Sequence, residues 1–127
     1  MLVEIVSPKK IEFSEEIDFF IVPCSEGDMG IFDKHTPVIS SLNIGLIYLY
    51  NKKKIMRKFI VTQGIIEISN NKCVILTEEV NDLDQVDLNS LKKNSSKLKD
   101  DPTRNLDYIK ESKKIFAIEN QYYSSTI

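Results

Sequence analysis

Apolar and polar positions alternate at short intervals over the first 85 residues, and this pattern predicts a series of β-strands. The runs are rich in β-branched and aromatic residues and are separated by glycine, proline or polar turns. The predicted strands cover residues 3–5, 11–13, 17–22, 44–50, 55–62, 65–68 and 73–76. The last two flank Asn70 and Asn71, which tolerate the positive φ angles of a tight hairpin turn. Short strands at this spacing favour a sandwich or barrel over a parallel α/β sheet.

The periodicity changes after residue 85 and predicts a first helix. Leu88, Leu91 and Leu98 fall on one face of such a helix, and Asp87 is a suitable N-cap. Asp101 and Pro102 then end this helix and start another, because proline is well suited to the first helical position.

A second helix is expected over residues 103–122, about 30 Å long at 1.5 Å per residue. Its apolar stripe consists of Leu106, Ile109, Phe116 and Tyr123, flanked by Tyr108, Ile115 and Tyr122. Such thin stripes bury little apolar area, so we expect the two-helix hairpin to need a partner surface.

Composition divides the chain at the same place. Residues 1–85 hold 39 apolar residues with 9 basic and 13 acidic ones, whereas residues 86–127 hold 14 apolar residues with 8 basic and 6 acidic ones. We therefore predict a β-sandwich domain over 1–85 and a helical hairpin over 86–127. The overall net charge of −2 gives no basic field for nucleic acid. No segment reads as a membrane span or a signal peptide.

Candidate chemistry is sparse, and we expect no catalytic residue and no metal site. The chain has one histidine, and Cys24 and Cys73 lie too far apart for a zinc-binding motif, so they are interpreted as buried free thiols. A hydrolase built on His35 is a weak alternative, because no nucleophile elbow is present. The glycines of segment 26–30 are interpreted as a turn, and the acidic residues between 78 and 84 as a solvated linker.

Two stretches then resemble the epsilon subunits of F-type ATP synthases. Residues 23–45, PCSEGDMGIFDKHTPVISSLNIG, are similar to the family pattern P-x-x-E-G-[DE]-x-G-[IL]-x-x-x-H-[AT]-P-[LV]-[IL]-[ST]-x-[LI]-x-x-G. Residues 59–68 resemble F-x-V-x-G-G-x-x-E-V, with Gln63 in place of the first glycine. The resemblance covers residues 1–85 well, and the remainder only by length and helical character.

The resemblance implies a ten-stranded β-sandwich followed by a C-terminal α-helical hairpin, in a non-catalytic rotor subunit. The implied partners are the gamma subunit and the ring of c subunits, at the cytoplasmic face of the bacterial inner membrane, with attachment only through the complex. Glu26, Asp28 and Met29 correspond to the loop that meets the c-ring. Ser7, His35 and Ser40 correspond to the face toward gamma. A stand-alone β-sandwich protein-binding module is the alternative.

The tail departs from the family in one motif. Some relatives bind ATP through [IL]-D-x-x-R-A, and here Asp87 is retained whereas Ser90 and Leu91 replace the arginine and alanine. Because the cationic contact is lost, we expect weak or absent ATP binding and no cofactor. In many relatives a basic tail meets the acidic beta subunits of the catalytic alpha/beta head and inhibits ATP hydrolysis, although a solvated helix face explains the lysines equally well. The basic residues here are Lys92, Lys93, Lys97, Lys99, Arg104, Lys110, Lys113 and Lys114.

Overall fold

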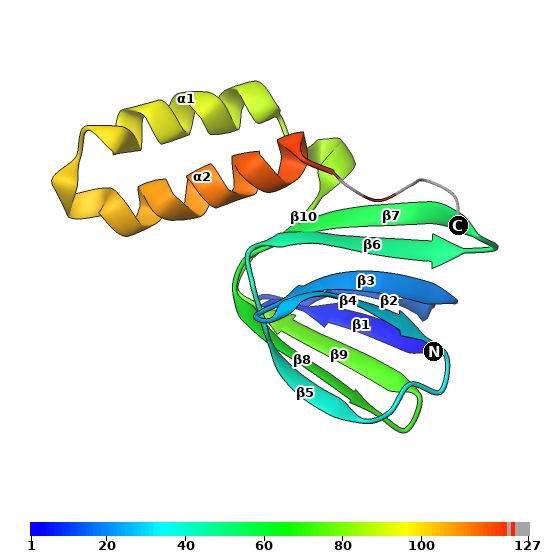
Figure 1. Ribbon diagram of the computed structural model, residues 1–127. Coiled ribbons are helices and arrows are strands. Elements are labelled where there is room, and N and C mark those ends of the chain that lie inside the picture. Colours follow the sequence, from blue (N-terminus) through cyan, green and yellow to red (C-terminus); the bar gives the residue numbers. More distant parts are fainter. Residues whose placement is uncertain (122, 124–127) are drawn as a thin grey trace.

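The computed structural model describes residues 1–121 and 123, and shows a β-sandwich with a helical hairpin at one side (Figure 1). The strands are β1 (Leu2–Val6), β2 (Ile11–Glu16), β3 (Phe19–Cys24), β4 (Gly27–Phe32), β5 (Val38–Leu42), β6 (Gly45–Asn51), β7 (Lys54–Val61), β8 (Gly64–Ser69), β9 (Lys72–Thr77) and β10 (Val80–Asp82). A short 3-10 turn (Leu83–Gln85) leads to α1 (Leu88–Lys99), and a second one (Pro102–Arg104) leads to α2 (Asn105–Glu119). The ten-stranded sandwich followed by two helices confirms the expected fold class.

The ten strands form one sheet that folds over on itself. Its order is β10-β7-β6-β3-β5-β8-β9-β1-β2, with β4 paired to β3 alone. Figure 1 shows β6 and β7 in one layer and β8 and β9 in the other. Phe13 of β2 packs edge-on to Phe59 of β7, with 5.4 Å between ring centroids. Strands from near the two ends of the sheet order therefore meet across the core, and the sandwich is almost a closed barrel.

Strand β6 is buried on both of its faces, which explains its unbroken apolar sequence. Alternate side chains of a strand point to opposite faces of the sheet. Ile47 and Leu49 therefore lie in the core between the layers. Tyr48 and Leu46 point outward instead, where they pack against Ile118 and its neighbours on α2. Through this outer cluster the hairpin packs against the sandwich.

Strand patterning found seven of the ten strands and missed β4, β5 and β10. Asn70 and Asn71 have φ angles of 52° and 57°, which confirms the predicted tight turn. The interpretation of residues 26–30 as a turn is wrong beyond Glu26, because β4 pairs with β3 from Gly27 onward. Gly27 itself has a φ of 120°, so a glycine is required there.

The helix boundaries follow the predicted capping residues. Asp87 caps α1, accepting hydrogen bonds from the backbone N–H groups of Asn89 and Ser90. Asp101 caps the 3-10 turn that Pro102 opens. Helix α2 starts at Asn105 and ends at Glu119, which makes it shorter than expected, because the side chain of Asn120 bonds the carbonyl of Phe116. The expected end at Tyr122 lies outside the described residues. No helix among residues 1–121 is long and apolar enough to cross a membrane.

Of the apolar stripe predicted for α2, Leu106, Ile109 and Phe116 remain exposed beside the sandwich, whereas Tyr123 packs against Tyr48 of β6. Leu106 and Phe116 are 81% and 61% exposed, whereas Ala117 and Ile118 make the contacts with β6. Lys114 of the same helix is buried and bonds Glu79 at the end of the sandwich. This ion pair and the contacts of Ala117 and Ile118 with β6 set the rotation of α2 about its axis, so the exposed stripe residues lie at the edge of the contact and line grooves there.

Candidate protein-interaction surfaces

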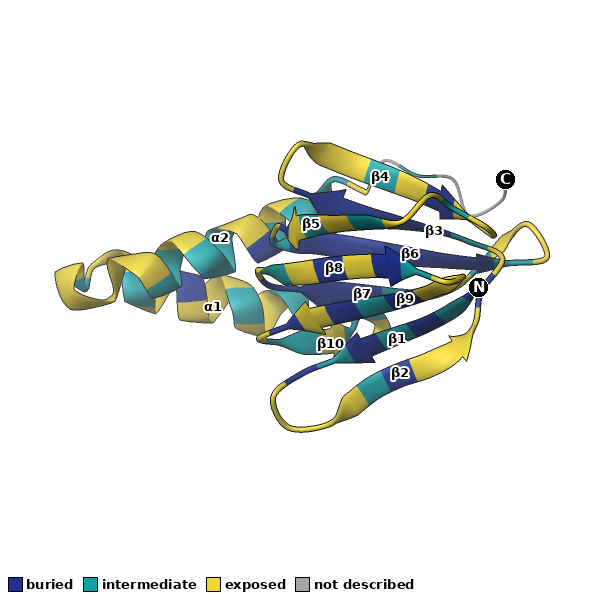
Figure 2. Cartoon of the chain, turned by 90° about the horizontal axis from the view of Figure 1, so that it is seen from below, coloured by how far each residue is buried: buried dark blue, intermediate teal, exposed yellow. Residues whose placement is uncertain are grey.

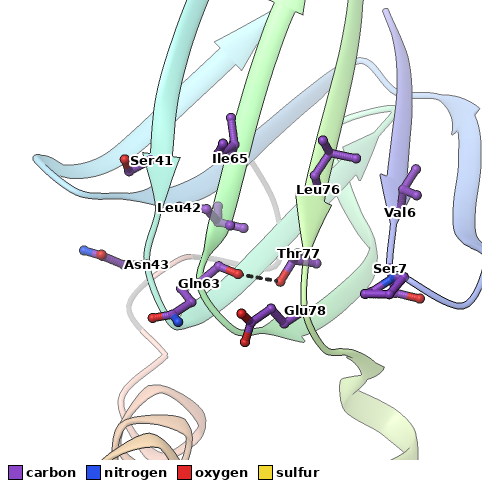
Figure 3. A pocket seen from close by; sticks show the side chains of 12 residues that line it. Val6, Ser7, Ser41, Leu42, Asn43, Gln63, Ile65, Leu76, Thr77 and Glu78 are labelled. Carbon is purple, nitrogen blue, oxygen red and sulfur yellow. Dashed lines mark hydrogen bonds between the residues drawn. The ribbon is translucent and has the colours of Figure 1, made fainter.

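The outer face of β5, β8 and β9 carries an exposed groove. This sheet groove has a volume of about 700 Å³ (Figure 3). It is lined by Val6, Ser7, Pro8, Ser41, Leu42, Asn43, Gln63, Gly64, Ile65, Leu76, Thr77 and Glu78. Ile65 and Leu76 are about half exposed there, although both are large and apolar. Two adjacent apolar side chains exposed on the outer face of a sheet make this face a candidate protein-interaction surface.

The floor of the sheet groove is rigid because β8 and β9 approach closely at Gly64. A Cβ atom at Gly64 would lie 1.9 Å from the carbonyl oxygen of Leu76, so no other residue fits without moving the strands apart. Beside it, the hydroxyl of Thr77 donates hydrogen bonds to the carbonyls of Thr62 and Gln63, at 2.9 and 3.3 Å. These bonds hold the loop before β8 against the end of β9.

The three residues predicted for the gamma interface lie apart from one another. Ser7 lines the sheet groove, is almost buried and donates a 2.8 Å hydrogen bond to Glu12 Oε1. His35 lies in the connection before β5, near the opposite end of β9, since the neighbouring Lys34 N–H donates to Asn71 Oδ1 at 2.8 Å. Ser40 is half-buried on β5 and its hydroxyl contacts the Cys24 thiol, away from the outer face.

The three residues predicted for the c-ring contact also differ in their surroundings. Glu26 is exposed in the turn between β3 and β4, as expected of a contact loop. Asp28 and Met29 belong to strand β4, so their side chains point to opposite faces. Asp28 is exposed, whereas Met29 is half-buried and packs against the core.

Asp28 also receives a contact from the tail that the sequence pattern did not reveal. The hydroxyl of Tyr123 donates a 2.6 Å hydrogen bond to Asp28 Oδ2. The ring of Tyr123 packs edge-on against Tyr48 of β6, with 5.1 Å between centroids. The hydrogen bond to Asp28 is the largest cause that raises the pKa of Tyr123 to about 12. The phenol therefore stays protonated and able to donate at neutral pH.

An ion-pair cluster joins α2 to the sandwich. Lys114 Nζ lies 2.8 Å from Glu79 Oε2, and Lys110 Nζ lies 3.0 Å from Glu79 Oε1. Lys114 also contacts Glu111 at 3.4 Å. The hydrogen bond from Lys114 is the largest cause that holds the pKa of Glu79 below its usual value, and the bond from Lys110 lowers it further. Two of the basic tail residues are therefore neutralised within the chain when the hairpin is docked.

The interpretation of residues 78–84 as a solvated acidic linker is therefore wrong for two of its four acids. Glu79 belongs to the ion-pair cluster, and Asp82 bonds the Arg57 guanidinium at 2.7 Å. Arg57 also lies over the rings of Phe13 and Phe59, 5.7 and 4.8 Å from their centroids. Charge pairing across 25 or more residues leaves no local signal in a sequence, which is why the pattern did not reveal it.

The residues of the degenerate nucleotide motif serve local structure at the start of α1. Asp87 Oδ2 accepts a 2.9 Å hydrogen bond from the Ser90 hydroxyl, and Asp87 Oδ1 accepts from the Asn89 N–H at 3.0 Å. The hydrogen bond from the Ser90 hydroxyl is the largest cause that lowers the pKa of Asp87, and the bonds from the backbone N–H groups add to it. Leu91 is half-buried on the next turn. The serine that replaces the family's arginine thus completes the helix cap.

Both cysteines are free thiols in the sandwich core, as expected. Burial raises the pKa of the Cys73 thiol to about 12, so this thiol is neutral and unreactive. Among the described residues no group of three or more histidine, cysteine, aspartate or glutamate side chains could hold a metal ion.

A near-closed β-sandwich with a rigid apolar groove on one sheet face and an ion-paired helical hairpin at its side defines a class of small protein-binding subunits. The sequence profile of the family described as "ATP synthase, Delta/Epsilon chain, beta-sandwich domain" matches residues 1–82. The chain belongs to this family.

Individual relatives agree with this assignment. The ATP synthase epsilon chain of Rhodospirillum rubrum is 36% identical over 80 residues, which cover 63% of this chain and 60% of the relative. The matched part thus spans less than two thirds of that relative's length. The epsilon chain of Leptospira interrogans serovar Lai is 36% identical over 107 residues, covering 82% of this chain and 84% of the relative.

A solved structure shares the fold over nearly the whole chain. A chain in the cryo-EM structure of the Euglena gracilis mitochondrial ATP synthase, OSCP/F1/c-ring in rotational state 1, superposes with a TM-score of 0.79. The superposition covers 94% of this chain and 79% of that chain at 16% sequence identity. The shared fold thus extends beyond residue 82 into the helical hairpin.

Proposed function

We propose that this chain is a central-stalk subunit of a proton-translocating F-type ATP synthase, in which it carries rotation of the c-ring through gamma to the catalytic head. It has no catalytic role of its own, because the reaction belongs to other subunits. Family membership supports this proposal. The sheet groove carries it structurally, because a rigid floor bearing two half-exposed apolar side chains, Ile65 and Leu76, suits permanent attachment to a partner.

Gamma is proposed to lie along the layer formed by β5, β8 and β9. Ser7 and His35 lie toward opposite ends of this layer. Strand β9 runs between these ends, and its six residues span about 20 Å at 3.3 Å per residue. A partner that contacts both must therefore extend along the sheet. Ser40 faces the sandwich interior and would act by supporting β5, not by direct contact.

The c-ring is proposed to meet the end of the sandwich that carries Glu26 and Asp28. Both carboxylates are exposed, so a partner's polar loops can reach them, although Asp28 already accepts the hydrogen bond from Tyr123. In this arrangement the chain is peripheral at the cytoplasmic face of the bacterial inner membrane and attaches only through the complex. Met29 would support β4 from the core side, since it packs inward.

The hairpin over residues 86–127 is proposed to regulate ATP hydrolysis, as a unit distinct from the sandwich over residues 1–85. Its ion pairs with Glu79 hold it docked, so a tail that reaches the acidic head must first exchange these partners for new ones. Nucleotide is not expected to control that exchange, because Ser90 leaves the start of α1 without a cation for the phosphates.

The proposed function is tested by reconstituting the ATP synthase core lacking this chain with wild-type protein or with Ile65→Asp. The wild-type chain should restore proton pumping coupled to ATP hydrolysis, and the variant should not, because a charge in the sheet groove opposes docking. Met56→Asp is the matched control, since Met56 is also an exposed apolar strand residue but lies on β7, outside the sheet groove. Full coupling with Ile65→Asp would refute the proposed use of the groove.

A further inference from the structure

Helix α2 carries an apolar face that has no cover in the docked hairpin. Leu106, Ile109 and Phe116 are 81%, 40% and 61% exposed. They lie at positions i, i+3 and i+10 of one helix, so they share a face. In Figure 2 exposed residues follow this helix along much of its length. Three large apolar side chains in a row are costly to leave in water, which indicates that this face is covered in the working protein.

The stripe forms one wall of two grooves between α2 and the sandwich. In one groove Leu106 and Ile109 lie opposite Ile44, Gln63 and Glu78. In the other groove Phe116 lies opposite Pro23 and Asp28, and Ile44 again lines it. The two grooves thus meet at Ile44.

The first of these grooves also runs into the sheet groove. Gln63 and Glu78 line both of them. A single surface therefore leads from Asp28, past the α2 stripe, to Ile65, Leu76 and Ser7. It joins the two regions that the proposed function gives to the c-ring and to gamma.

We propose that the docked hairpin forms part of the gamma-binding surface, with one segment of gamma lying against Ile65 and Leu76 of the sheet and against Leu106 and Ile109 of α2. This inference rests on the proposed function and adds the hairpin to it. Gamma is inferred as the partner of the α2 stripe because Gln63 and Glu78 line both grooves. A gamma segment that fills the sheet groove therefore reaches the α2 stripe past these two residues.

The charge at the junction specifies the partner segment further. Glu78 is exposed where the two grooves meet, and no ion pair involves it among residues 1–121. The other acids near this point are Glu79, which pairs with two lysines, and Asp107, which pairs with Arg104. Lys110, which pairs with Glu79, and Lys113 line the α2 side of the same groove. The gamma segment should therefore be apolar, with a basic residue on the Glu78 side and none opposite Lys113.

One consequence is that gamma binding and hairpin docking reinforce each other. In this arrangement a gamma segment contacts the sheet groove and α2 together in the docked form, so it binds the docked form more tightly than a form in which this joint contact is lost. By linkage, gamma must then stabilise docking by the same factor. Gamma binding is therefore expected to favour the docked hairpin.

The test is a titration of the full-length chain into the ATP synthase core that lacks it, with the dissociation constant as readout. Leu106→Asp combined with Ile109→Asp should weaken binding about tenfold or more. Both positions are exposed, so the fold should persist, and a thermal unfolding curve checks this. Met56→Asp, on the other side of the sandwich, should change the constant by less than about twofold.

A second variant, Glu78→Lys, lies on the sandwich and leaves α2 unaltered, so it separates loss of contact from loss of docking. It should also weaken binding. If Ile65→Asp abolishes binding while the α2 double variant and Glu78→Lys bind as the wild type does, the hairpin is not part of the interface and the proposed function stands. If the wild-type chain does not bind the core, both proposals fail. If the α2 double variant removes only self-association of the chain, the stripe binds a second copy and the inference is wrong.

Discussion

The sandwich and the hairpin are held in place by different interactions. The sandwich has a core of closely packed apolar side chains, with ladder pairing from one end of the sheet order to the other. The hairpin rests on a small apolar contact, in which Ala117 and Ile118 meet β6, on the ion-pair cluster at Glu79 and on the hydrogen bond from Tyr123 to Asp28.

This difference separates a permanent scaffold from a part that can be released. Apolar burial carries no charge for moderate salt to screen, whereas partly exposed ion pairs are screened by salt and contribute about 1 kcal/mol or less each. The sandwich should therefore respond to changes in packing and the hairpin to changes in charge.

The largest effect is expected in the scaffold at Gly64. In Gly64→Ala the added Cβ would collide with the carbonyl of Leu76 at 1.9 Å, so β8 and β9 must separate and the core must open. We expect a loss of roughly 3 kcal/mol or more in the free energy of unfolding, measured by urea denaturation. Gly30→Ala is the matched control, since its Cβ would meet only the Phe19 ring at 3.1 Å, and a side chain can move. Equal losses at the two sites would contradict this account of the floor of the sheet groove.

The same contrast explains what the sequence could predict. Turns and caps are local, so Asn70, Asn71, Asp87 and Pro102 were identified correctly from their neighbours alone. Seven strands were found because alternation is also local. Strand β4 was missed because its pairing with β3 overrides the turn character of two glycines in four residues, which no short window reveals.

The interaction surfaces were harder to predict because they depend on contacts distant in sequence. The pairs Glu79–Lys114 and Asp28–Tyr123 join segments 35 and 95 residues apart. One signal was available for the sheet groove, because Ile65 shares a strand face with Glu67 and therefore had to point outward. The sequence pattern grouped the apolar residues of α2 correctly onto one face. It did not predict where this face would point, because the ion-pair cluster helps to set which face of the helix meets the sandwich.

An intermediate effect is expected at Glu79. In Glu79→Gln both lysines lose their carboxylate, so docking of α2 should weaken by about 1 kcal/mol, which corresponds to about a fivefold faster amide hydrogen exchange in α2. Added salt should have the same effect on the wild type and little on the variant. Glu78→Gln serves as the control, because Glu78 has no ion pair within the described chain. No change in exchange on Glu79→Gln would show that the ion-pair cluster does not contribute to docking.

The pH dependence of docking follows from the lowered pKa of Glu79. The stabilisation by a carboxylate of this kind is fully present above its pKa in the released state, about 4.3, and is lost as pH falls through the lower pKa of the docked state. Hydrogen exchange in α2 should therefore accelerate as pH falls below about 4.3, after correction for its intrinsic pH dependence. The variant Glu79→Gln should lack this step, and a step retained in the variant would assign it to another carboxylate.

The smallest effect is expected at Tyr123. Tyr123→Phe keeps the ring against Tyr48 and removes only the hydroxyl that bonds Asp28, so docking should weaken by about 0.5–1 kcal/mol. Exchange at the last turn of α2 should then rise about threefold, less than in Glu79→Gln. Asp28→Ala should have the same effect, and the double variant should add nothing further, because both changes remove one bond. Additive effects would show that Asp28 and Tyr123 act separately. An effect larger than that of Glu79→Gln would show that this hydrogen bond contributes more to docking than the ion-pair cluster does.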